Sequence, residues 1–177
     1  MKYLWSTMLL AALFFTQSAW AKLELRQVPQ GVNLEGKLGG RMDGAAWHSG
    51  EMKGKVHVLF YVDPDLRDLN NDASEALKAE SFPREKYQPL AVINVAASRL
   101  PKFLVKSSLK KKQKRYPDTI YVRDNKKIIV KAWEIDDENN NVLAFDKEGR
   151  LFFIKEGKLN PGEIKDLIEL IYQHLEK

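Results

Sequence analysis

Hydrophobic and polar positions follow two different periods along this chain, and the changes of period predict its elements. Residues 56–62 (VHVLFYV) form an apolar, β-branched and aromatic run, which is typical of a strand covered on both faces. Residues 66–80 then place leucines and alanines at helical spacing, with charged residues between them. Residues 90–95 (LAVINV) predict a second buried strand. This first half of the pattern therefore predicts a strand, a helix and a strand.

A helix is expected to follow from Pro101 to about Arg115, because Pro117 disfavours helical backbone at the residue before it. Three apolar side chains of this helix are predicted to face the core: Phe103, Leu104 and Leu109.

Two hairpins and a final helix complete the pattern. Residues 119–122 and 128–133 flank a polar turn, and residues 142–145 and 150–154 flank a second turn that contains Gly149. The final helix has the clearest signal. Asn160 and Glu163 form a capping box around Pro161, and Ile164, Leu167, Ile168, Ile171 and Leu175 follow as one apolar stripe.

This order of elements predicts an α/β fold with one mixed sheet. Two consecutive strand–helix–strand crossovers require parallel strands with right-handed connections, whereas the hairpins add antiparallel strands. Residues 22–55 are rich in glycine and predict short strands and turns before the first long strand.

The first residues predict a signal peptide. Lys2 precedes a mostly apolar segment that is too short to span a bilayer, and residues 19–21 (AWA) form the pattern that a signal peptidase cleaves after. We therefore expect cleavage after Ala21 and a single mature domain at 22–177, without a transmembrane segment. An uncleaved membrane anchor is the alternative.

Composition narrows the possible functions. The formal charge of +5 falls to +4 when Lys2 is removed, which does not by itself indicate a nucleic-acid partner. The chain contains no cysteine, although export delivers a protein to a compartment where disulfides normally form. Thiol chemistry by the chain's own residues is excluded.

Several stretches resemble known proteins. Residues 53–55 before the first long strand and residues 143–150 resemble segments of redoxins, the thioredoxin-like superfamily. Residues 54–59, 103–109, 114–117, 132–138 and 142–149 are similar to the YtfJ family of periplasmic thioredoxin-like proteins. The resemblance covers nearly all of the mature chain. It implies a thioredoxin-like fold and a periplasmic location, and it implies no specific activity.

The redoxin site is expected to be degenerate. The comparison with redoxins places Leu66 and Leu69 near the two cysteines of the C-x-x-C motif, and it places Asn140 near the cis-proline that faces this motif. A leucine has no ionisable group, whereas redox exchange needs a thiolate. We therefore predict that the chain is not a thiol-disulfide oxidoreductase.

Other candidate sites have simpler structural interpretations. Asp63, Asp65 and Asp68 follow the first long strand, and residues 134–138 contain a second group of acids. Either group offers carboxylates for acid–base catalysis or for a cation, but a solvated turn explains both.

The histidines lack metal-ligand spacing. His57, Trp47 and Trp133 are expected to be core residues, and we predict no metal and no cofactor.

The helix at 101–115 carries the best surface candidate. Seven basic residues fall within 14 positions that contain no acid: Lys102, Lys106, Lys110, Lys111, Lys112, Lys114 and Arg115. They predict a surface for an acidic protein or anionic lipid headgroups, although a solvated helix face is the simpler interpretation.

Together these features predict a monomeric periplasmic protein of thioredoxin-like fold. We expect it to be a binding or accessory module that acts on an unknown periplasmic protein or acidic surface. The alternative is a cysteine-independent enzyme that uses the acids named above.

Overall fold

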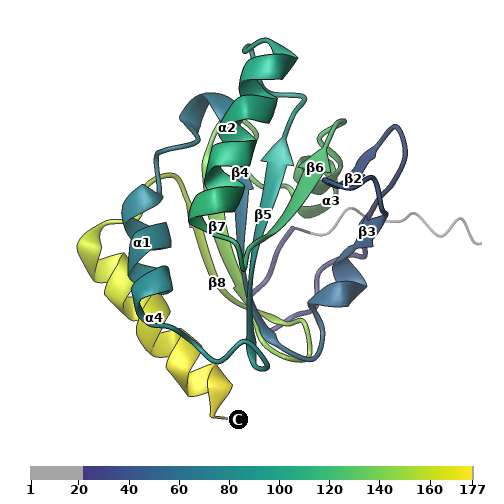
Figure 1. Cartoon of the computed structure of the whole chain (residues 1–177). Coiled ribbons are helices and arrows are strands. Elements are labelled where there is room, and N and C mark those ends of the chain that lie inside the picture. Colours follow the sequence, from purple (N-terminus) through teal and green to yellow (C-terminus); the bar gives the residue numbers. More distant parts are fainter. Residues whose placement is uncertain (1–21, 177) are drawn as a thin grey trace, which may run out of the picture.

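A six-stranded mixed sheet forms the centre of the fold, in the order β2-β6-β5-β4-β7-β8 (Figure 1). The computed structural model describes residues 22–176, so the predicted signal peptide lies outside the described residues. Strands β4, β5 and β6 are parallel, and β2, β7 and β8 each pair antiparallel with a neighbour. The strands are β2 (Gly39–Arg41), β4 (Val56–Val62), β5 (Tyr87–Asn94), β6 (Ile120–Asp124), β7 (Asn140–Phe145) and β8 (Leu151–Glu156).

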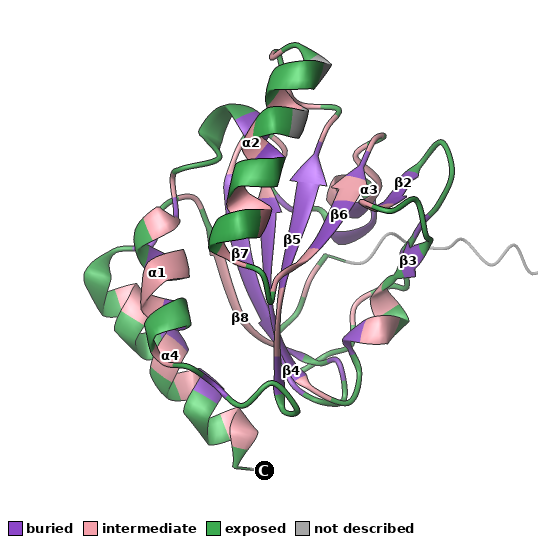
Figure 2. Ribbon diagram, viewed as in Figure 1, coloured by how far each residue is buried: buried purple, intermediate pink, exposed green. Residues whose placement is uncertain are grey.

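Strand β4 lies between β5 and β7 and is covered on both faces, as its continuous apolar run predicts. The sheet divides its alternate side chains between two cores. Val58 and Phe60 pack with helices α1 (Asn71–Ala79) and α4 (Pro161–Leu175). Leu59 and Tyr61 pack on the opposite face. Figure 2 shows the buried sheet between helices whose outer sides are exposed.

The opposite face is covered by short elements from distant parts of the sequence. Helix α3 (Ile128–Trp133) packs there beside the small sheet of β1 (Asn33–Leu34) and β3 (Trp47–His48). Trp47 and Trp133 are buried in this core, and His57 is buried as well, so these three predictions are confirmed. The short strands also confirm the prediction for residues 22–55.

The predicted capping box of the final helix is present. The Asn160 side chain accepts a hydrogen bond from the Glu163 backbone N–H (3.0 Å), and the Glu163 carboxylate accepts one from the Asn160 N–H (2.8 Å). These bonds satisfy two N–H groups that the first turn of a helix leaves without partners. The hairpin of β7 and β8 is confirmed too.

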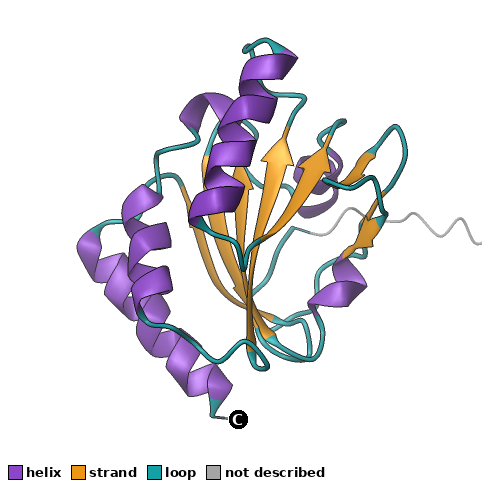
Figure 3. Ribbon diagram, viewed as in Figure 1, coloured by secondary structure: helices purple, strands orange, loops and turns teal. Residues whose placement is uncertain are grey.

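The prediction of a hairpin at 119–133 is wrong. Residues 128–133 form helix α3, and β6 pairs with β2 instead (Figure 3). The buried Asp124 carboxylate accepts backbone hydrogen bonds from Ile128 and Ile129 (2.9 Å each), which starts the helix. Burial of Ile129, Ala132 and Trp133 on one side then outweighs the strand preference of the β-branched residues.

Two further details differ from prediction. The helix expected at 66–80 begins only at Asn71, after a 3₁₀ turn (Pro64–Leu66) that Asp63 caps.

Helix α2 (Lys102–Arg115) has the predicted bounds, but Phe103 is 70% exposed and Leu104 is 42% exposed. Figure 1 shows the reason: the start of α2 extends past the ends of the strands, where no core can cover it.

Candidate functional site: a cavity between helices α1 and α2

A cavity of about 600 Å³ lies between α1 and α2, above one face of the sheet. Alternate side chains of the strands form its floor, because they point to the same face. The apolar floor residues are Phe60 and Val62 of β4, Tyr87, Ala91 and Ile93 of β5, and Tyr121 of β6. Leu77 of α1 and Leu109 of α2 line the two sides. The volume is within the range of small-molecule binding sites.

The cavity exists because the two helices belong to separate apolar clusters. Ala73 and Leu77 of α1 pack with the cluster that includes α4. Leu109 packs with Ala91, Ile93 and Tyr121, and it is the only buried residue of α2 among those whose side chains are described. Helix α2 is mostly polar and lacks the apolar stripe that would seat it against α1. The space between the clusters therefore stays open.

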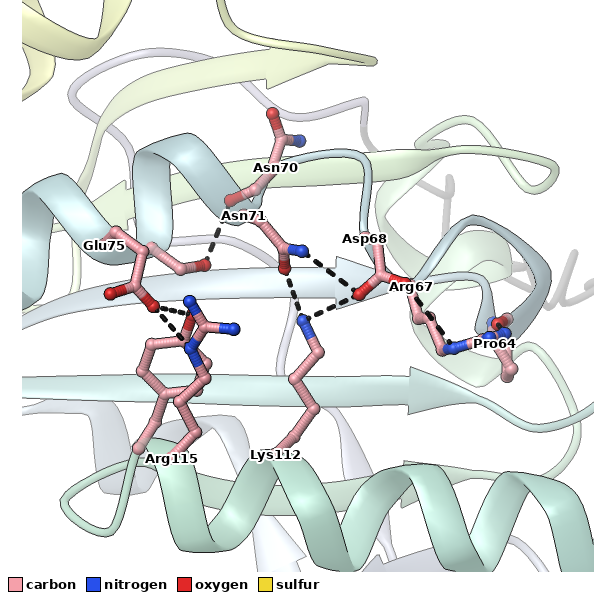
Figure 4. Close-up of polar contacts among 10 residues, drawn as sticks. Pro64, Arg67, Asp68, Asn70, Asn71, Glu75, Lys112 and Arg115 are labelled. Atoms are coloured by element: carbon pink, nitrogen blue, oxygen red, sulfur yellow. Dashed lines mark hydrogen bonds and ion pairs between the residues drawn. The ribbon is translucent and has the colours of Figure 1, made fainter.

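Polar side chains bridge the cavity between the helices (Figure 4). The Lys112 ammonium group of α2 lies 3.2 Å from the Asp68 carboxylate and also donates to the Asn71 side chain. One turn further along, the Arg115 guanidinium donates to the Glu75 carboxylate (2.7 Å), which also accepts a hydrogen bond from the Tyr116 hydroxyl. The two helices are thus held together by long polar side chains.

These bridges change the acidity of the groups that form them. Burial alone would raise the pKa of Asp68, but the hydrogen bonds from Asn71 and Lys112 outweigh it and lower that pKa. The hydrogen bond from Tyr116 is the main cause that lowers the pKa of Glu75. Both carboxylates are therefore held in the charged form near neutral pH.

Two residues that line the cavity each contain a buried polar atom without a hydrogen-bond partner among the described residues. The atoms are the Tyr87 hydroxyl oxygen and the Asn140 amide oxygen, in residues that are 8% and 2% exposed. Burial also raises the pKa of Tyr87, so its hydroxyl keeps the proton that it can donate. Buried polar groups are usually paired, and an unpaired one costs about 1–3 kcal/mol. A ligand group that reaches either atom would supply the missing partner.

The charged side chains that line the cavity are mostly basic. Among the described residues, five of the six are cationic, namely Lys55, Arg67, Lys78, Arg84 and Lys112, and Asp118 is the only acid. Arg84 pairs with Asp118 (2.7 Å), and Lys112 pairs with Asp68. The electrostatic environment of the cavity therefore favours an anion.

The described side chains of the predicted basic surface point to different sides of α2. Lys110, Lys111 and Lys114 are exposed, whereas Lys112 and Arg115 turn toward α1. The side chains of Lys102 and Lys106 lie outside the described residues. The three exposed lysines form no ion pair within the described part of the chain, and they stay a predicted contact surface for an acidic partner.

The predicted degenerate redox positions lie at one end of the cavity. Leu66 is exposed in the 3₁₀ turn, and Leu69 is partly buried before α1. Asn140 is opposite Val62 in the β4–β7 register, and the Asp63 N–H donates to the Asn139 carbonyl (3.2 Å). The segment after β4 and the start of β7 are therefore neighbours in space.

The acidic groups do not converge on the cavity. Asp65 accepts hydrogen bonds from Ser98 and Arg99, and Asp137 pairs with Lys127. Asp63 is buried, and burial is the main cause that raises its pKa. None of the acids at 63–68 or 134–138 lines the cavity. Within residues 22–176 no group of three metal-ligating side chains has the geometry to hold an ion.

The sequence did not identify the residues from the end of α1 to the start of β5 as part of a site. Phe82, Arg84 and Tyr87 all line the cavity. The alternation of Tyr87, Ala91 and Ile93 along β5 was a usable signal, because it places an aromatic hydroxyl and a small residue on the same face.

The sequence comparison decides the family. Residues 27–174 match the family described as "Bacterial protein of unknown function (YtfJ_HI0045)". The chain belongs to this family. It is 30% identical over 133 residues to the protein YtfJ of Escherichia coli K12. The aligned segment covers 73% of this chain and 72% of that protein. A protein of Haemophilus influenzae is 29% identical over 172 residues, and the aligned segment covers 92% of this chain and 94% of that protein.

Solved structures confirm the thioredoxin-like fold. The thioredoxin domain of a thiol-disulfide oxidoreductase from Bacteroides vulgatus superimposes with a TM-score of 0.60 at 14% identity, covering 84% of this chain and 98% of that one. A thiol-disulfide isomerase from Corynebacterium glutamicum gives 0.56 at 17% identity, with coverages of 91% and 99%. The present chain has this fold without any cysteine. Among its described residues, no helix is long and apolar enough to cross a membrane.

Proposed function

We propose that this family member is an exported binding module that holds a small, largely apolar ligand between α1 and α2. The observation that carries the proposal is the cavity of about 600 Å³ with an apolar floor, whose lining includes two residues, Tyr87 and Asn140, that each contain a buried polar atom without a partner among the described residues. Such a combination is typical of ligand sites, in which a few polar groups orient a mostly apolar molecule.

Binding explains the site better than catalysis does. A cysteine-independent enzyme would need a carboxylate, a nucleophile or a base at the reacting position. Asp118 is the only carboxylate within residues 22–176 that lines the cavity, and its pairing with Arg84 occupies it. Ser108 also lines the cavity, but no histidine or free acid lines it that could activate the hydroxyl.

A fluorescence titration with the uncharged dye Nile red tests this proposal. Ser108 and Ser107 are adjacent on α2, but Ser108 lines the cavity and Ser107 is exposed. We expect saturable one-to-one binding to the wild type and to Ser107→Phe, and at least tenfold weaker binding to Ser108→Phe, whose ring would occupy part of the site. Equal binding to all three proteins, or no binding to the wild type, would overturn the proposal.

The export step has a separate test. The signal pattern at residues 19–21 is the support for it. Mass spectrometry of protein recovered from the periplasm should give the mass of a chain that begins at Lys22. Full-length protein in the cytoplasmic fraction would contradict export.

A further inference from the structure

We propose that the ligand is a single-chain fatty-acid carboxylate, with its head group at the Tyr87 end of the cavity and its acyl chain along the sheet floor toward Asn140. This inference rests on the proposed function and specifies the ligand class for the same site.

The cationic side chains that line the cavity favour a ligand with an anionic head group. Lys55 and Lys78 line it, and each donates to a backbone carbonyl oxygen: Lys55 to Arg84 (2.6 Å) and Lys78 to Arg115 (3.1 Å). Neither ammonium group forms an ion pair with a carboxylate of the described chain. A ligand carboxylate would supply the charge-assisted partner that both cations lack.

The two unpartnered polar atoms decide the orientation of the ligand. The Tyr87 hydroxyl can donate a hydrogen bond to a carboxylate, whereas the Asn140 amide oxygen can only accept and would repel it. Tyr87 is opposite Val56 in the sheet register, so it lies at the end of β4 that follows Lys55. The head group therefore belongs at the end that contains Tyr87 and Lys55.

The shape of the floor suits an extended chain. Tyr87, Pro89, Ala91 and Ile93 lie on the same face of β5 and all line the cavity. At about 3.3 Å per residue, the path from Tyr87 to Ile93 is roughly 20 Å long. Ile93 is level with Val62, which is opposite Asn140 on β7. The floor between the two polar ends is lined by apolar side chains.

A peptide is a poorer fit for the same space. The floor is made of inner strands, and the backbone groups of β4, β5 and β6 are already paired with neighbouring strands. The backbones of α1 and α2 are paired within the helices. An enclosed peptide would therefore bury amide groups without partners, which is costly, whereas an acyl chain has none to satisfy.

Displacement of bound Nile red distinguishes these possibilities. We expect dodecanoate to displace the dye at least tenfold more effectively than dodecan-1-ol, which has the same chain without the charge. From octanoate to decanoate to dodecanoate, each step should tighten binding about tenfold, because two more methylene groups are buried.

Two variants test the position of the head group. Tyr87→Phe removes only the unpartnered hydroxyl, and Lys78→Gln removes one lining charge. Each should weaken dodecanoate binding about five- to tenfold and leave dodecan-1-ol binding unchanged. Lys110→Gln, an exposed change on α2 outside the cavity, is the matched control and should have no effect.

The outcomes separate the two proposals. If Nile red binds in a Ser108-dependent way but dodecanoate does not displace it, or displaces it no better than dodecan-1-ol, the fatty-acid inference is wrong and the cavity proposal stands. Displacement by an apolar end-blocked hexapeptide instead would identify a peptide site and overturn the inference. Failure of the dye itself to bind would overturn both.

Discussion

The Lys112 ammonium group of α2 lies 3.2 Å from the Asp68 carboxylate, in the segment between β4 and α1. A residue that the sequence assigns to an outward basic surface therefore ties α2 to the segment before α1. Its side chain is 24% exposed, whereas Lys110 and Lys111 are exposed residues. The basic helix thus has two roles: one side closes a cavity and the other faces solvent.

Removing this tie should loosen α2 without unfolding the protein. In Lys112→Met we expect faster amide hydrogen exchange in the middle of α2, because only Leu109 and the contacts of Arg115 and Tyr116 with Glu75 then hold the helix. The free energy of unfolding should fall by less than about 1 kcal/mol, since the Asp68 side chain is 60% exposed and solvent screens the pair. Lys110→Met serves as the control. Identical exchange in both variants would show that the bridge does not hold the helix.

The buried Asp124 should be much more sensitive to substitution. Its carboxylate accepts hydrogen bonds from the Tyr61 hydroxyl (3.1 Å) and from the N–H groups that begin α3. Asp124→Ala should lower the free energy of unfolding by about 3 kcal/mol or more, because several buried donors lose their partner. Tyr61→Phe removes one of these bonds and should cost about 1–2 kcal/mol. Urea denaturation measures both changes.

A similar loss in the two variants would contradict this account, because α3 would then not depend on Asp124. Circular dichroism of the folded Asp124→Ala protein adds a second measurement: helix content should decrease, whereas Tyr61→Phe should keep it.

His57 should make the protein less stable in mild acid. Burial is the main cause that lowers the pKa of this histidine below 6.5. Below that pH the unfolded chain binds a proton that the folded chain does not, so the free energy of unfolding falls as the pH decreases from 7 to 5. We expect His57→Gln to show a shallower pH dependence over this interval, measured by urea denaturation at each pH.

His48→Gln is the control for this measurement, because the His48 side chain is 59% exposed. The pKa of Asp63 is raised, so this residue makes the free energy of unfolding increase as the pH falls, which is the opposite of the effect of His57. Asp63 is present in every protein compared, so its effect is removed when the pH dependences are compared. A slope in His57→Gln as steep as in the wild type would rule out His57 as the cause.

The elements with strong local signals were predictable from sequence. Strand β4 follows from a continuous apolar run, and α4 follows from Asn160, Glu163 and one apolar stripe. Helix α3 was missed because its six residues read as a β-branched strand. The spacing of Ile129, Ala132 and Trp133 was helical, but the deciding contact is the buried carboxylate of Asp124, which only the tertiary structure reveals.

The cavity was not predictable for a similar reason. It depends on the separation of α1 and α2, which follows from the weak apolar side of α2 and from bridges between residues about 40 positions apart, such as Glu75 and Arg115. The sequence did predict that Asn140 lies near the segment after β4, and the structure places them side by side. It did not show that the Asn140 amide oxygen would lack a partner.

The most direct test of the central claim, that the cavity between α1 and α2 is the binding site, is a methyl NMR titration with Nile red. The methyl signals of Leu77, Ile93 and Leu109 should shift, because these residues line the cavity. Those of Leu34 and Ile129, in the core on the opposite face, should stay unchanged. Shifts confined to the opposite core, or equal shifts on both faces, would contradict the account.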